Sequence, residues 1–207
     1  MTEYWPILIP LFTYLIGSVP FGSMIGRLTA SVDITQLGSG NTGATNVARE
    51  IGIKWGLLTL FLDMIKGFLP VYIYISLYDP PKPWLSIAIP VSLLLGHRFS
   101  PFLKFRGGKG VATALGIFLA LSPVKVFILF PVFALIVYVT GYVSLGSMTA
   151  ACMMPLILFF TGSDKDMLIT AVCLAGIICV FHKDNITRLI KGEERSLKKI
   201  KSRKNIQ

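Results

Sequence analysis

Charged residues are scarce in this chain, and their scarcity excludes most classes of soluble protein. Asp, Glu, Lys and Arg make up only 14% of the 207 residues, whereas hydrophobic residues make up 54%. A soluble domain usually carries about a quarter charged residues. With a mean hydropathy of +0.71, the composition predicts an all-α integral membrane protein, and residues 1–207 are expected to form a single membrane-embedded domain.

Cysteine is also rare, and the few cysteines do not form a recognisable pattern. Cys152, Cys173 and Cys179 all lie in apolar runs, and an odd, buried set argues against a disulfide framework. No Cys/His spacing typical of a zinc site is present. The aspartates are too scattered to provide an obvious site for a divalent metal. We therefore expect neither a metal nor a cofactor.

Long apolar runs, by contrast, are abundant. A helix needs roughly 20 residues to cross the bilayer core. The first, second and sixth runs reach this length easily, whereas the fourth must borrow flanking residues or cross only part of the membrane. The sequence predicts a bundle of about seven transmembrane helices, in the apolar runs Tyr4–Gly26, Trp55–Tyr78, Trp84–Phe99, Val111–Leu121, Val126–Thr140, Val143–Thr161 and Met167–Phe181.

Lys and Arg are concentrated on one side of this predicted bundle. With seven spans, the loops 27–54, 100–110 and 141–142 share a side with the segment that begins at His182, and together they hold most of the basic residues. The positive-inside rule then places the N-terminus outside and the C-terminus in the cytoplasm. Residues 193–207 are predicted to be a basic cytoplasmic tail. The net charge of +10 is thus mainly a topology signal with attraction to anionic membrane lipid, and we expect no nucleic-acid partner.

Three polar stretches interrupt the apolar runs, at 38–46, 107–113 and 182–189, and all fall on the predicted cytoplasmic side. Glycines let backbone N–H groups converge on an oxyanion, and Lys or Arg adds charged contacts to phosphate. The first stretch contains Gly-x-Gly-x-x-Gly, but no strand precedes it, so a dinucleotide site is rejected. The second resembles a P-loop without its spacing. Their convergence predicts an enzyme that works on phosphorylated substrates at the membrane surface.

Simpler interpretations stay open for the first and third stretches. The first can be a turn that caps a helix over Thr42–Ile53, and the third can be an interfacial amphipathic tail, which we accept for the residues after Glu194. Asp63 and Lys66 lie within the second apolar run and are expected to form a structural pair. His97 is expected to be structural as well. Ser144 and Ser147 are weaker candidates for substrate contacts, because membrane serines often bond to their own helix.

In this order, and on one side of seven spans, the three stretches closely resemble the PlsY family, the acyl-phosphate:glycerol-3-phosphate acyltransferases of bacteria. The resemblance covers nearly the whole chain. It implies an enzyme of the bacterial inner (cytoplasmic) membrane that moves a fatty acyl group from acyl phosphate to the 1-hydroxyl of glycerol 3-phosphate. The products would be lysophosphatidic acid and inorganic phosphate, at the start of phospholipid synthesis, and a monomer is expected.

The site expected from these stretches contains two groups of residues. The catalytic group is Ser39, Lys109, His182 and Asn185. The substrate-binding group is Gly38, Gly40, Asn41, Thr45, Asn46, Arg49, Lys104, Gly107, Gly108, Gly110, Ser144, Ser147 and Arg188. Within these groups, we expect the four glycines Gly38, Gly40, Gly107 and Gly108 to offer backbone donors to the phosphate of the acyl donor.

Neither histidine has the acidic partner of a His-x-x-x-x-Asp pair, and no nucleophile with a base is evident. Direct transfer is therefore the simpler scheme, with the substrate's own phosphate as the favoured base and His182 as the alternative base.

Two other functions are possible alternatives. An organic-phosphate transporter would place its polar residues near the midplane, and a metal-dependent phosphotransferase would need clustered aspartates, whereas Asp33, Asp63 and Asp184 are far apart.

Overall fold

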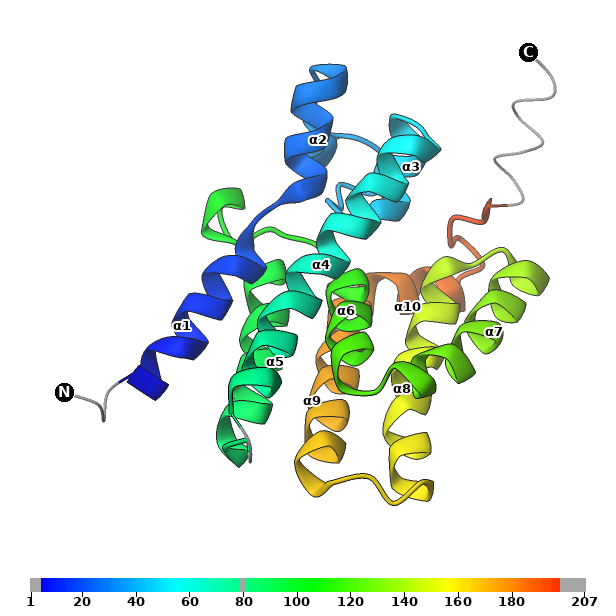
Figure 1. Ribbon diagram of the computed structural model, residues 1–207. Helices are drawn as coiled ribbons and strands as arrows, with labels where there is room; N and C mark the ends of the chain where they lie inside the picture. Colours follow the sequence, from blue (N-terminus) through cyan, green and yellow to red (C-terminus); the bar gives the residue numbers. More distant parts are fainter. Residues whose placement is uncertain (1–4, 79–80, 198–207) are drawn as a thin grey trace, which may run out of the picture.

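The protein is described by a computed structural model that covers residues 5–78 and 81–197, and this described part contains helices and no strand. Every predicted apolar run is helical, which confirms the all-α prediction (Figure 1). The α-helices are α1 Trp5–Ser18, α2 Phe21–Ala30, α3 Ala44–Glu50, α4 Ile53–Leu77, α5 Pro83–Arg98, α6 Val111–Leu121, α7 Pro123–Thr140, α8 Val143–Phe160, α9 Lys165–Phe181 and α10 Lys183–Ile190. Short 3₁₀ turns lie at Ile34–Gln36 and Pro101–Leu103.

Most of these helices are long and apolar enough to cross a membrane. Within the described residues, 5 segments meet this criterion: 7–30, α4, 83–103, α7 and α8. A sixth is added if α9 and α10, which are bent by 59°, count as one span. Helix α6 has only 11 residues, which agrees with the expectation that the fourth run is short. The protein is therefore a multi-pass membrane protein, while the number of seven spans stays a prediction.

The first apolar run is not one continuous helix, as the sequence led us to expect. It is broken at Val19 and Pro20 into α1 and α2. Proline has no N–H and disfavours helical geometry in the residue before it. The carbonyl of Val19 instead accepts a hydrogen bond from Nζ of Lys66, at 2.8 Å. A buried lysine of α4 thus compensates for the break between α1 and α2.

Lys66 belongs to a buried polar cluster inside the bundle. Its Nζ lies 2.6 Å from Oδ1 of Asp63, and both side chains are almost fully buried. Nδ1 of His97 lies 3.8 Å from the same carboxylate oxygen and 3.3 Å from Oγ1 of Thr113. The predicted structural pairing of Asp63 with Lys66 is confirmed, and His97 is part of the same cluster.

Small residues let the helices approach closely. A side chain at Gly67 of α4 would collide with the carbonyl of Thr113 in α6, and one at Gly116 of α6 would collide with the carbonyl of Met64. Such small-residue contacts are typical of helices packed in lipid, where backbone proximity supplies van der Waals attraction. Large apolar side chains such as Phe127, Phe130 and Phe160 remain exposed on the outside, as expected for a surface covered by lipid.

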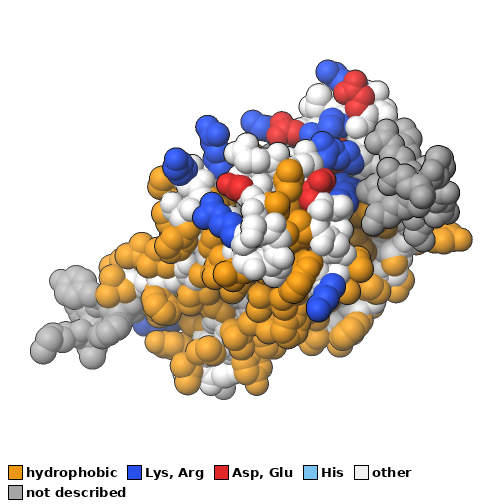
Figure 2. Space-filling view, turned by 90° about the horizontal axis from the view of Figure 1, so that it is seen from above, with side chains coloured by type: hydrophobic (Ala, Val, Ile, Leu, Met, Phe, Trp, Pro, Cys, Tyr) orange, Lys and Arg blue, Asp and Glu red, His pale blue; other side chains and the backbone are white. Residues whose placement is uncertain are grey.

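The three polar stretches lie at the same end of the bundle. In Figure 1 the connections 31–43 and 99–110, the turn at 141–142 and the segment 182–197 all lie toward the upper end. Seen from that end, Lys and Arg side chains gather over the surface, with a few acidic residues among them, and apolar side chains surround them (Figure 2). The predicted one-sided clustering is confirmed, while the assignment of this face to the cytoplasm stays a prediction.

Candidate active site

A cavity of about 340 Å³ opens at this polar end of the bundle. All three polar stretches contribute to its wall, as the sequence predicted. It is lined by Ser39, Gly40 and Asn41 of the first stretch, by Arg98, Phe105, Arg106, Gly107 and Lys109 around the second, and by Phe181, Asp184, Asn185 and Arg188 around the third.

Asn46, in α3, shapes the first stretch. Its side chain is buried, and its Oδ1 accepts the backbone N–H of Ser39 at 3.0 Å. Its Nδ2 donates to the carbonyl of Leu37 at 3.0 Å. Gly38 and Gly40 have positive φ angles of 60° and 68°, which only glycine adopts easily. Both amide positions of Asn46 therefore hold the loop, and Asn46 stabilises the Ser39 segment in the cavity wall.

The second stretch packs against α5, where two of its backbone N–H groups are occupied. The N–H of Gly107 donates to the carbonyl of Arg98 at 2.7 Å, and the N–H of Gly108 donates to the carbonyl of His97 at 3.2 Å. A side chain at Gly108 would collide with the ring of His97. These glycines are needed because the loop passes so close to α5.

Our prediction that the glycines of both loops offer backbone donors to phosphate is therefore wrong for Gly40, Gly107 and Gly108, and for Gly38 it stays a prediction. The donors of Gly107 and Gly108 are occupied within the protein, and the N–H of Gly40 donates to the carbonyl of Leu37 at 2.9 Å. Charged and polar side chains remain to bind an anion here. Arg98, Arg106, Lys109 and Arg188 supply them, so the cavity is strongly cationic.

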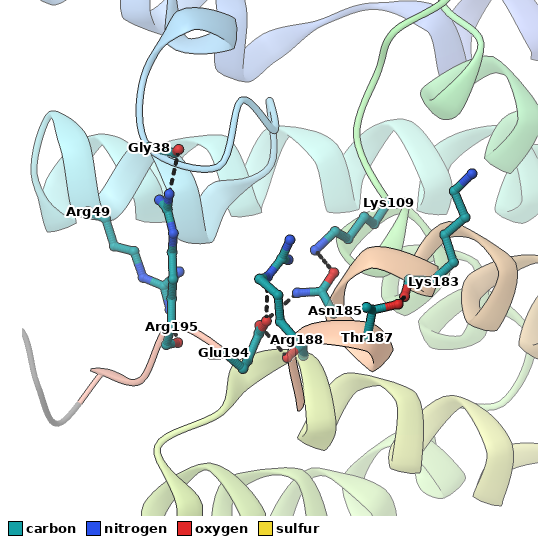
Figure 3. A network of polar contacts seen from close by, with 10 residues as sticks. Gly38, Arg49, Lys109, Lys183, Asn185, Thr187, Arg188, Glu194 and Arg195 are labelled. Carbon is teal, nitrogen blue, oxygen red and sulfur yellow. Dashed lines mark hydrogen bonds and ion pairs between the residues drawn. The ribbon is translucent and has the colours of Figure 1, made fainter. Parts of the chain in front are cut away.

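A connected network of polar side chains borders the cavity (Figure 3). Nζ of Lys109 donates to Oδ1 of Asn185, and Nδ2 of Asn185 donates to Oε1 of Glu194 at 2.7 Å. Oγ of Ser144 donates to the same carboxylate oxygen at 2.7 Å. Nε of Arg188 lies 2.9 Å from Oε2 of Glu194. One carboxylate thus joins groups from α8 and α10, and Asn185 links it to Lys109 in the loop before α6.

The charge states in this network follow from burial and from hydrogen bonding. Burial alone would raise the pKa of Glu194, but hydrogen bonds from Ser144, Asn185 and Arg188 hold that pKa below its ordinary value. Burial lowers the pKa of Lys109 to about 8, although the nearby Glu194 opposes the shift. Near neutral pH, the network therefore contains an ionised carboxylate and a lysine that is still mostly protonated.

His182 lies at the corner between α9 and α10 and is buried. Its Nδ1 is 2.8 Å from the carbonyl of Ile178. Because a carbonyl can only accept, this nitrogen carries the proton, and Nε2 of the neutral ring carries the lone pair. Burial lowers the pKa of His182 to about 4, despite this hydrogen bond. The side chain is therefore neutral at physiological pH, and it is not among the residues that line the cavity.

The segment that follows α10 packs against the site, which corrects the tail prediction. Nη2 of Arg195 donates to the carbonyl of Gly38 at 2.7 Å, and Nη2 of Arg49 donates to the carbonyl of Arg195 at 2.9 Å. The N–H of Leu197 donates to the carbonyl of Gly141 at 2.9 Å. The interpretation of the residues after Glu194 as a simple interfacial tail is wrong for 195–197, and 198–207 lie outside the described residues.

Other predicted site residues stand apart from the cavity wall. Lys104 is exposed, and Oγ of Ser147 donates to the carbonyl of Val143 in its own helix. Gly38, Thr45, Asn46, Arg49, Gly108, Gly110 and Ser144 are also absent from the wall, although several of them support it. Among them, Nε of Arg49 is buried without a hydrogen-bond partner in the described structure.

Several cavity residues were missed from the sequence. Arg98 follows His97, and Phe181 precedes His182, so each lies directly beside a residue that was singled out. Phe105 and Asp184 line the cavity as well. Counting the flanking residues with each motif would have found most of them. No comparable local signal pointed to Glu194 and Arg195.

A cationic cavity built from polar loops, at one end of an apolar helical bundle, defines a membrane-embedded site for an anionic substrate. Comparison with known proteins names the family. The profile of the glycerol-3-phosphate acyltransferase family matches residues 7–192. This chain belongs to that family.

Similar proteins cover nearly the whole chain. A glycerol-3-phosphate acyltransferase of Trichlorobacter lovleyi is 47% identical over 187 residues, which cover 89% of this chain and 94% of the relative. A glycerol-3-phosphate acyltransferase of Aquifex aeolicus is 41% identical over 184 residues, covering 89% of this chain and 95% of the relative.

Solved structures agree in fold. A crystal structure of PlsY, an integral membrane glycerol 3-phosphate acyltransferase, in a glycerol 3-phosphate form matches with a TM-score of 0.88 and 39% identity, covering 93% of this chain and 96% of that one. Its lysophosphatidic acid form matches with a TM-score of 0.86 and 40% identity, covering 93% and 95%. The predicted resemblance to the PlsY family is confirmed.

Proposed function

We propose that this acyltransferase takes its acyl group from a fatty acyl phosphate and transfers it to the 1-hydroxyl of glycerol 3-phosphate. The cavity, with four basic side chains in its wall, is the observation that carries this proposal. Both proposed substrates bear phosphate, and a wall of this charge suits two phosphate groups side by side. Family membership supports glycerol 3-phosphate as the acceptor, since related PlsY was crystallised in a form named for it.

The reaction then needs no covalent intermediate on the protein. The 1-hydroxyl oxygen of glycerol 3-phosphate attacks the acyl carbonyl carbon, and the bond from that carbon to the phosphate oxygen breaks. Lysophosphatidic acid and inorganic phosphate result. Lys109 and Asn185 lie in contact in the cavity wall, and we assign to them, with Ser39, the role of binding phosphate oxygens and holding the reactants together. Proximity and electrostatic stabilisation of the oxyanion supply the rate enhancement.

The proton of the 1-hydroxyl passes, in our scheme, to the phosphate dianion of glycerol 3-phosphate itself. A phosphate monoester has a second pKa of about 6, so the dianion is abundant at neutral pH. His182 is the alternative base, but its pKa of about 4 makes it a weak proton acceptor. The same protonation state leaves Nε2 as a hydrogen-bond acceptor, so His182 suits a positioning role.

His182→Gln distinguishes the two routes. Glutamine keeps hydrogen-bonding groups but cannot act as a base. Substrate assistance predicts measurable kcat with a raised KM for glycerol 3-phosphate. Loss of kcat at saturating substrate, with binding intact, would make His182 the general base.

The donor is tested directly. Purified protein in lipid vesicles is incubated with glycerol 3-phosphate and either a fatty acyl phosphate or a fatty acyl-CoA. We expect lysophosphatidic acid and stoichiometric phosphate release with acyl phosphate alone. Comparable turnover with acyl-CoA would refute the proposed donor, while leaving acyltransfer to glycerol 3-phosphate in place.

We further place the protein, as a monomer, in the cytoplasmic membrane of a bacterium with its cavity facing the cytoplasm. The charge asymmetry supports this orientation. Cysteines introduced at Ser39 and Gly192, in a variant lacking the native cysteines, should react with an impermeant maleimide only from the cytoplasmic side. Labelling of either cysteine from the outside would contradict this orientation.

The two alternative functions, an organic-phosphate transporter and a metal-dependent phosphotransferase, gain no support. The polar residues meet at one end of the bundle, and the family is an acyltransferase family.

A further inference from the structure

Two cysteines face each other across a helix pair outside the cavity. Sγ of Cys152, in α8, lies 3.6 Å from Sγ of Cys179, in α9. Both thiols are free. A disulfide bond is about 2.05 Å long, so only a small approach of the two helices separates the free thiols from a bond. We propose that Cys152 and Cys179 form a reversible disulfide within the membrane, and that this bond controls the acyltransferase site.

The third cysteine, Cys173, makes no comparable contact with another thiol within the described residues. Cys173 and Cys179 are six residues apart on α9, which corresponds to about 9 Å at 1.5 Å per residue. Two cysteines on one helix at that separation exceed the roughly 7 Å limit between the Cα atoms of a disulfide. A metal is not favoured at the Cys152–Cys179 pair either, because no group of three or more metal-ligating side chains occurs among the described residues.

The oxidant must reach the pair from the lipid. Cys152 is exposed on the surface of α8, a helix that meets the criteria for a membrane span, and Leu156 one turn further on is 56% exposed. A lipid-soluble quinone is the chemical class that fits this position. Two S–H bonds break and one S–S bond forms, and the two electrons and two protons reduce the quinone to hydroquinone.

Cys179 is directly connected to the third polar stretch. Its backbone carbonyl accepts the N–H of His182 at 3.1 Å. The carbonyl of the preceding Ile178 accepts from the same N–H at 3.0 Å and from Nδ1 of His182 at 2.8 Å. His182 in turn leads into α10, which carries Asn185 and Arg188 in the cavity wall. A displacement of Cys179 is therefore transmitted to the corner that aligns α10.

Cys152 connects to the same site through the other helix. Helix α8 begins at Val143, and its first turn carries Ser144, whose hydroxyl donates to Glu194. Glu194 also accepts from Asn185. A bond between Cys152 and Cys179 thus draws together the two helices whose ends hold opposite sides of the Glu194 network. We expect the oxidised form to be the less active one, because the free-thiol arrangement is the one in which this network is complete.

The test uses the full-length protein in phospholipid vesicles. It is oxidised with decylubiquinone, a lipid-soluble quinone, or with copper phenanthroline, and remaining thiols are then alkylated with N-ethylmaleimide. Peptide mass spectrometry under non-reducing conditions should find Cys152 joined to Cys179. Acyltransferase activity should fall by about tenfold or more, since a misplacement of about 1 Å can cost on the order of 100-fold. Dithiothreitol should restore both the free thiols and the activity.

Three matched variants separate the possible causes. Cys173→Ala should form the same cross-link and lose activity in the same way as the unaltered protein. Cys152→Ala and Cys179→Ala should keep their activity through the oxidation. If neither oxidant produces the cross-link, the proposed disulfide between Cys152 and Cys179 is overturned. Cross-linking without a change in activity, or equal inactivation of Cys152→Ala, would overturn its control of the reaction. The cross-link is detected without any substrate, so its outcome is independent of the proposed acyl donor.

Discussion

Two polar networks occupy this bundle, and they differ in whether their side chains are enclosed by the helices or border a cavity. The cluster of Asp63, Lys66, His97 and Thr113 joins α4, α5 and α6 within the bundle, and its two charges lie against each other. The network of Lys109, Asn185, Glu194 and Arg188 borders a cavity instead. Both contain buried charge. The inner cluster uses its charges to hold helices, whereas the outer network leaves Lys109, Asn185 and Arg188 along an open wall where a ligand can meet them.

The largest effect is expected from breaking the inner cluster. Asp63→Ala leaves Lys66 buried without its carboxylate, and removing one partner of a buried pair typically costs about 3–5 kcal/mol. We expect a marked fall in the midpoint of thermal unfolding in detergent, measured by tryptophan fluorescence. Asp63→Leu combined with Lys66→Met should be milder than Asp63→Ala. A double variant as unstable as the single one would show that the pair is needed for more than charge balance.

Removing one cation from the outer network should affect activity more than stability. Lys109→Met is expected to lower kcat/KM by about 100-fold or more, the scale seen when one preorganised donor is lost. Lys104→Met is the matched control, because Lys104 lies on the same loop but is exposed, and it should cost less than about threefold, as most surface changes do. Equal losses for the two variants would mean that bulk positive charge near the membrane is what matters.

The same lysine should give the reaction a pH dependence. With its pKa lowered to about 8, Lys109 is charged below that pH and neutral above it. Binding of a phosphate dianion therefore weakens as the pH rises through 8. Because kcat/KM reports the free enzyme, we expect it to fall above about pH 8, while Lys109→Arg, which stays charged, should abolish the fall. A profile that is unchanged in Lys109→Arg would assign the transition to another group.

The smallest effect is expected where the tail meets the first loop. Arg195→Ala removes the hydrogen bond to the carbonyl of Gly38, and one such bond contributes about 0.5–1.5 kcal/mol. We expect KM for glycerol 3-phosphate to rise by about two- to tenfold, with the midpoint of thermal unfolding nearly unchanged. Lys191→Ala is the control, since Lys191 is an exposed residue just past the end of α10. A response no larger than that of Lys191→Ala would remove Arg195 from the site.

The helical regions and the meeting of the three motifs could be predicted from the sequence, because both depend on local patterns. Apolar runs indicate helices directly, and alternating spans place every second loop on the same face. The break at Pro20 could also have been predicted, since proline disrupts helices, but the apolar run continues through it and was interpreted as one helix.

What could not be predicted depends on contacts between distant segments. Ser144 and Glu194 are 50 residues apart, and Arg195 and Gly38 are 157 apart. Neither Glu194 nor Arg195 differs locally from any charged residue in a basic segment. The prediction for Gly107 and Gly108 was wrong for the same reason. Their backbone N–H groups are occupied by carbonyls of α5. The closeness of α5 to this loop is set by helix packing and not by the sequence of the loop.

The position of Glu194 in the chain has a consequence for biosynthesis. Helices α1 to α10 of the described residues all precede it in sequence, so every one of them is synthesised before the carboxylate that joins Asn185, Arg188 and Ser144 emerges from the ribosome. A nascent chain that ends before Glu194 lacks the counterion that Asn185, Arg188 and Ser144 contact in the complete chain. The Glu194 network can therefore be completed only after α1 to α10 have all been synthesised.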